Sequence, residues 1–88
     1  MNLEQRIKAF TALGNHLQQM SAEAFESLAE SARMENPWFT NDNIKKSLDG
    51  IARFLDKDVL LEWTSRYTLS PKSPKTVALV MAGNIPLV

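Results

Sequence analysis

The sequence predicts a mostly α-helical segment, three to four helices followed by one buried strand, that begins a larger α/β protein. From residue 3 to residue 67, apolar side chains recur every three or four positions, which is the spacing of amphipathic helices. From Val77 to Met81 an apolar run has no polar alternation, which indicates a strand buried on both faces of a parallel sheet. Such a sheet needs several strands joined by long crossovers, so we expect the α/β body to continue beyond Val88.

The first predicted helix covers residues 2–20. Asn2 can cap it, and Gln5 stands three positions later as the second half of a capping box. Glycine lowers helix propensity by about 1 kcal/mol relative to alanine, so we expect Gly14 to bend or end the helix near Asn15. The apolar stripe of this helix consists of Leu3, Ile7, Phe10, Leu13, Leu17 and Met20.

The second predicted helix follows Ser21, a favourable N-cap residue. It ends at Asn36-Pro37, because proline lacks an N–H and disfavours helical geometry in the residue before it. Its narrow apolar face consists of Phe25, Leu28, Ala29 and Ala32.

Trp38 and Phe39 fall in the break between the second and third predicted helices. They could stack on a ligand, but aromatic residues at a helix–helix corner more often fill the core, and we expect that role.

Thr40 is the expected N-cap of a third helix. Asp49 and Arg53 stand one turn apart and are expected to pair on its solvent face, while Gly50 weakens its middle. Its apolar stripe consists of Ile44, Leu48, Ile51, Ala52 and Leu55.

Asp58 is the expected N-cap of a short fourth helix, with Glu62 and Arg66 as an ion pair one turn apart. The inner residues of this helix are predicted to be Leu60, Leu61, Trp63 and Tyr67. Two Ser-Pro pairs then indicate an extended linker. The predicted division is a helical region over residues 1–70, followed by residues 71–88 as the linker, first strand and loop of a truncated nucleotide-binding domain.

Charge and composition exclude several functions. Ten acidic and ten basic residues cancel, whereas a dedicated nucleic-acid binder needs a basic surplus, so no nucleic-acid partner is expected. There is no cysteine, and the only histidine, His16, is expected to be an ordinary helix residue, so no metal site is predicted. The N-terminus is not a signal peptide and no apolar run is long enough for a membrane span, so a soluble, cytoplasmic protein is expected.

The loop that follows the predicted strand is the candidate site. Ligands of open α/β sheets bind beyond the carboxyl ends of the strands, where this loop would lie. Gly83 would let a ligand approach the backbone, and the Asn84 side chain offers an N–H donor of the kind that stabilises a developing oxyanion. Gly-Asn is also a common turn pair, so the residues alone leave a simple turn as the alternative.

Two short motifs resemble those of bacterial acyl-CoA reductases, the relatives of the fatty-acid reductase that supplies aldehyde to bacterial luciferase. Residues 80–88 (Val-Met-Ala-Gly-Asn-Ile-Pro-Leu-Val), preceded by residues 73–77 (Ser-Pro-Lys-Thr-Val), resemble the start of the cofactor-binding domain of this family. Residues 35–40 (Glu-Asn-Pro-Trp-Phe-Thr) resemble a signature of one of its branches. The resemblance implies an aldehyde dehydrogenase-like fold and NADPH-dependent reduction of an activated acyl group to an aldehyde, through an acyl-thioester on a cysteine.

The resemblance also implies roles for particular residues. Asn84, followed by Ile85-Pro86, matches the asparagine whose amide forms the oxyanion hole, and Met81, Ala82 and Gly83 would bind the cofactor near its nicotinamide. The implied partners are an acyl-CoA or another activated acyl substrate and the remainder of the chain's own catalytic body, and a homo-oligomer is also compatible. Because the 88 residues hold no cysteine, the nucleophile would lie beyond them, and this segment alone should be inactive.

A different class of function remains open. The chain could be a small helical protein-interaction module, with residues 76–88 as an apolar segment that docks on a sheet or groove of a partner.

Overall fold

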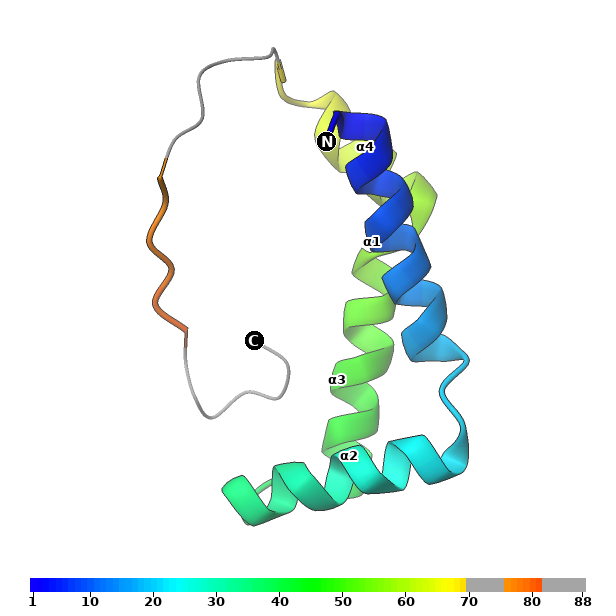
Figure 1. The fold of residues 1–88 in the computed structure, drawn as a ribbon, viewed down its shortest axis with the longest axis vertical. Coiled ribbons are helices and arrows are strands. Elements are labelled where there is room, and N and C mark those ends of the chain that lie inside the picture. The colour runs from blue at the N-terminus through cyan, green and yellow to red at the C-terminus, as the bar shows by residue number, and fades with distance from the viewer. Residues whose placement is uncertain (70–75, 82–88) are drawn as a thin grey trace.

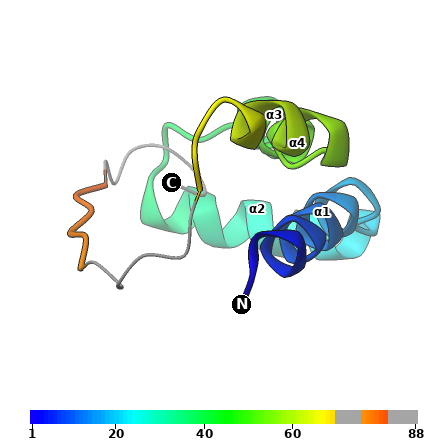
Figure 2. The ribbon, with the colours of Figure 1, turned by 90° about the horizontal axis from the view of Figure 1, so that it is seen from above.

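The structure, a computed structural model, describes residues 1–69 and 76–81. Four helices form most of this part of the chain: α1 (Leu3–Gln18), α2 (Ala22–Glu35), α3 (Asn41–Phe54) and α4 (Lys57–Ser65). The long helices α1 and α3 lie side by side, α2 crosses one end of this pair, and α4 packs at the other end (Figure 1). Seen from above, α3 and α4 lie on one side and α1 lies on the other (Figure 2). The prediction of a mostly helical segment is confirmed.

Short-range hydrogen bonds fix the helix starts. Asn2 and Gln5 form the predicted capping box, in which Asn2 Oδ1 accepts from the Gln5 N–H at 2.8 Å and the Asn2 N–H donates to Gln5 Oε1 at 2.9 Å. Ser21 and Thr40 cap α2 and α3 as predicted. The predicted cap of α4 is wrong by two positions: Asp56 Oδ1 accepts from the backbone N–H of Asp58 at 2.9 Å, so Asp58 lies inside the first turn.

The main core lies where α2 crosses α3. Ala29, Ile44 and Leu48 are buried there, and Ala29 and Ile44 have exposed fractions of 0% and 1%. Partly buried side chains surround them: Leu17, Phe25, Leu28, Ala32 and Phe39. Alanine at the centre lets the two helices approach closely, as expected from the narrow apolar face of α2.

A polar contact also links α2 to α3. Glu26 on α2 accepts a hydrogen bond from the Asn41 amide at 3.3 Å, at the start of α3, and forms an ion pair with Arg33 at 3.1 Å. A buried apolar contact and an exposed polar contact thus both join α2 to α3.

A second packed region joins α1 to α3 and α4. Ile7 and Gly14 on α1 are buried, as are Ala52 on α3 and Leu60 on α4. A Cβ atom added at Gly14 would lie 2.8 Å from the Leu55 Cβ and 3.3 Å from the Ala52 carbonyl oxygen. The predicted bend or end of the helix at Gly14 is wrong, because α1 continues to Gln18 and the glycine provides room for α3 instead.

Ion pairs on the helix surfaces follow the prediction in α4 and depart from it in α3. Arg66 and Glu62 pair at 2.6 Å as predicted. Asp49 pairs with Lys45, one turn before it, at 3.8 Å, rather than with the predicted Arg53. The Glu62–Arg66 and Lys45–Asp49 pairs are both exposed and one turn apart, and such pairs contribute little to stability.

The predicted buried strand is not seen. The residues predicted to form it, Val77 to Met81, have no strand pairing, and they are extended chain that lies apart from the helices (Figures 1 and 2). The exposed fraction is 82% at Val77 and 98% at Val80. A strand requires a neighbouring strand for its backbone hydrogen bonds, and the described residues contain none.

Trp38 does not fill the core at the corner between α2 and α3, contrary to the prediction. Its side chain is 87% exposed, whereas the neighbouring Phe39 packs against the core. The Trp38 backbone N–H donates to Asn36 Oδ1 at 3.1 Å, which closes the turn so that only one of the two aromatic residues faces inward.

Candidate functional site

The predicted oxyanion and cofactor residues are described only in part. Met81 is the last residue of the extended segment, and its side chain is 50% exposed. Ala82, Gly83 and Asn84 lie outside the described residues. The roles of these four residues therefore remain predictions.

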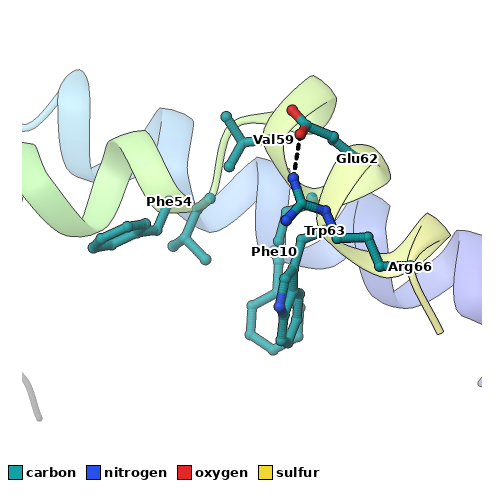
Figure 3. Close-up of a pocket in the computed structure, with 8 residues that line it drawn as sticks. Phe10, Phe54, Val59, Glu62, Trp63 and Arg66 are labelled. Atoms are coloured by element: carbon teal, nitrogen blue, oxygen red, sulfur yellow. Dashed lines mark hydrogen bonds and ion pairs between the residues drawn. The ribbon is translucent and has the colours of Figure 1, made fainter.

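A largely apolar groove lies between α1 and α4, and we call it the α1/α4 groove. It has a volume of about 560 Å³, within the usual range for ligand sites. Phe10 from α1 and Trp63 from α4 lie side by side in this lining (Figure 3). Phe54 and Leu55 line the groove at the end of α3. The remaining residues that line it are Val59, Leu60, Glu62 and Arg66.

Two side-chain contacts link α4 to the residues that directly follow it. The Trp63 and Tyr67 rings meet edge to face, with centroids 6.0 Å apart and planes at 74°. Glu62 and Arg66, the two charged residues of the groove, bind each other at 2.6 Å (Figure 3). The groove is thus a hydrophobic surface lined by aromatic side chains, and its two charged residues pair with each other.

A second groove, of about 680 Å³, also lies between α1 and α4. It is lined by Leu3, Glu4, Ile7, Lys8, Thr11, Ala12, Asn15, Lys57 and Leu61. The Thr11 Oγ1 atom is buried and has no hydrogen-bond partner in the structure. This hydroxyl is the one polar side-chain atom of the described residues left buried and unpaired, and it lies where α1 packs on its neighbours.

His16, the only histidine of the sequence, and the acidic side chains are the remaining candidate metal ligands. His16 is exposed near the end of α1. Within residues 1–69 and 76–81, no group of three His, Cys, Asp or Glu side chains is placed to hold a metal ion. None of the described helices has both the length and the apolar character required to cross a membrane.

Sequence reasoning missed the α1/α4 groove, although a signal for it is present. Phe54 lies off the predicted stripe of α3, and Val59 lies off the predicted inner face of α4. Large apolar residues outside a core stripe are candidates for a contact surface. Phe10 and Trp63 were expected in the core, but their exposed fractions are 51% and 59%.

Comparisons of the chain with protein-family models, with curated proteins and with solved structures found no match. Within residues 1–69 and 76–81, the structure shows a small segment of four α-helices with an apolar groove between α1 and α4.

Proposed function

We propose that this chain is the N-terminal part of a cytoplasmic, NADPH-dependent acyl-CoA reductase of the aldehyde dehydrogenase-like superfamily. The observation that carries the proposal is the motif at residues 80–88, in which Asn84 and Pro86 follow an apolar run at the distance expected for an oxyanion loop after a first strand. The motif at residues 35–40 occurs upstream in the order that the resemblance requires.

Two features of the structure support a larger parent protein. The apolar segment Thr76–Met81 is exposed, and a strand of a parallel sheet would bury these side chains on both faces. The α1/α4 groove leaves aromatic side chains uncovered, as expected for helices that pack against a further body.

The proposed chemistry assigns distinct tasks to the residues of the loop. Asn84 would donate a hydrogen bond from its side-chain amide to the thioester oxygen as negative charge develops there, an interaction stronger in the transition state than in the ground state. Met81, Ala82 and Gly83 would line the approach to the nicotinamide. Met81, the one of these three that is described, has a half-exposed side chain that a ligand can reach. NADPH, when bound, supplies the hydride for reduction of the acyl group.

A direct assay tests this proposal. The complete reading frame that contains these residues is expressed, and loss of NADPH absorbance is followed with a long-chain acyl-CoA. The proposal predicts aldehyde formation and a cysteine encoded downstream of Val88. A reading frame that stops at Val88, or an intact protein with no acyl-CoA-dependent oxidation of NADPH, contradicts it.

A second candidate is a helical protein-interaction module with an apolar C-terminal docking segment. The exposure of Trp38 favours it, because tryptophan is enriched among the residues that dominate binding energy at protein interfaces. The assay above separates the two, since this module needs neither a downstream cysteine nor NADPH.

A further inference from the structure

Residues 76–81 form an extended segment whose backbone N–H and C=O groups have no hydrogen-bond partner among the described residues. The segment lies apart from the helices (Figures 1 and 2). In the four helices, by contrast, most of the backbone groups bond to each other within the helix. An extended chain with open N–H and C=O groups is a surface on which another strand can pair.

The side chains of this segment are exposed on both of its sides. Successive residues of an extended chain point to opposite sides, so Val77 and Val80, three positions apart, lie on different sides. Their exposed fractions are 82% and 98%. A groove between two helices can cover one side of such a segment and leaves the other in water. Burial of both sides requires a layered arrangement, in which sheets of paired segments stack face to face.

The sequence of the segment is suited to pairing with identical copies of itself. Residues 76–81 contain no charged residue, no proline and no glycine. Three of the six, Thr76, Val77 and Val80, are β-branched, which favours extended structure. Six-residue segments of this kind pair in register with the same segment of other chains and bury their side chains between stacked sheets. Because the segment carries no charge, no repulsion within it opposes such pairing.

We infer that the partner of residues 76–81 is the same segment of a second copy of this chain, and that the copies form an intermolecular β-sheet while their helices stay folded. Each strand has two edges, so pairing continues beyond a dimer. Met34 is exposed to a similar degree, but its backbone belongs to α2 and cannot join a sheet. The inference does not rest on the proposed reductase function.

Sedimentation velocity and infrared spectroscopy of the 88-residue chain, over a range of concentrations, test the inference. The expected result is species larger than a dimer that increase with concentration and carry the amide I band of intermolecular β-sheet. Val80→Lys adds a charge within the segment, at a side chain that is 98% exposed and makes no contribution to the helical core. It should lower the assembled fraction at least about ten-fold at equal concentration, because stacking would bury an unpaired charge.

Met34→Lys is the matched control, because it adds the same charge at an exposed apolar position of α2, outside the segment. This variant should assemble as the unaltered chain does. Deletion of residues 76–88 should abolish both the large species and the β-sheet band. Far-ultraviolet circular dichroism of each variant confirms that the helices remain.

Three results would overturn the inference. An unaltered chain that stays monomeric at every concentration has no self-pairing segment. Equal loss of assembly in Val80→Lys and Met34→Lys would mean that exposed apolar side chains associate without strand pairing. Large species that lack the β-sheet band would mean that the copies meet through their helices instead.

Failure here is distinguishable from failure of the proposed function. All of these measurements use the 88-residue chain, which has no cysteine nucleophile and needs no catalysis. A monomeric 88-residue chain leaves acyl-CoA reduction by the complete protein untouched. Assembly of the 88-residue chain beside an inactive complete protein counts against the reductase alone.

Discussion

Gly14 on α1 faces Leu55 at the end of α3 so closely that a Cβ on the glycine would lie 2.8 Å from the Leu55 Cβ. Real Cβ atoms do not approach one another to this distance, so the contact requires a residue without a side chain. The glycine lowers the intrinsic helix propensity of α1 by about 1 kcal/mol, and the close approach of the two helices compensates for that loss.

Gly14→Ala should therefore destabilise the helical region, although alanine is the better helix former. Overpacking typically costs about 1–3 kcal/mol, which exceeds the propensity gain of about 1 kcal/mol. Urea denaturation followed by circular dichroism measures the difference. Gly50→Ala is the matched control, because a Cβ at Gly50 in α3 would meet nothing within 4 Å, and it should stabilise by about 0.5–1 kcal/mol. Stabilisation by both substitutions would refute the close contact at Gly14.

Thr11→Val should raise the stability of the helical region by about 1 kcal/mol. The Thr11 hydroxyl is buried without a hydrogen-bond partner, and burying such a group costs about 1–3 kcal/mol. Valine keeps the branched shape and replaces the hydroxyl by a methyl group. Thr11→Ser, which keeps the hydroxyl and loses the methyl, should not stabilise. A fall in the urea midpoint for Thr11→Val would show that the hydroxyl has a favourable contact after all.

Ile44→Ala should be severe and Trp38→Ala mild. Ile44 is 1% exposed at the contact of α2 with α3, and truncation of such a residue costs about 2–5 kcal/mol. Trp38 is 87% exposed, so its removal should change stability by less than about 0.5 kcal/mol. Thermal melting of the two variants compares them directly. Comparable losses would mean that Trp38 is covered in solution.

Asn84→Ala in the complete protein should lower kcat by about 10²–10³, the usual effect of losing one oxyanion-hole donor. NADPH affinity should change little, because the backbone of Met81 to Gly83 remains. Steady-state kinetics with a long-chain acyl-CoA and a separate NADPH titration measure the two quantities. Near-normal kcat would reduce Asn84 to a turn residue and remove the site assignment.

The features that could be predicted from the sequence are those set by neighbours in the chain. The capping box of Asn2 and Gln5, the Ser21 cap and the Glu62–Arg66 pair each depend on residues three or four positions apart. The features that were missed depend on distant parts of the chain. The role of Gly14 depends on Leu55, and the outward position of Trp38 depends on which aromatic residue the α2–α3 core accepts.

The two candidate sites differ in the same respect, because one was predicted from neighbouring residues and the other depends on distant ones. Asn84 and its neighbours were selected by a local motif, whose geometry depends on strands that the described residues do not contain. The α1/α4 groove depends on how three helices meet, so no local pattern could place Phe10 beside Trp63.

Helix α3 contributes buried residues to both packed regions, Ile44 and Leu48 against α2, and Ala52 beside Gly14 of α1. Because neither region can open without exposing a face of α3, its amides should exchange with solvent deuterium most slowly and should report the free energy of global unfolding. Helices α2 and α4 each lie at one end of α3, so each can detach while the other stays packed. Local unfolding of this chain should therefore proceed inward from both ends of α3, with two separate sets of faster-exchanging amides.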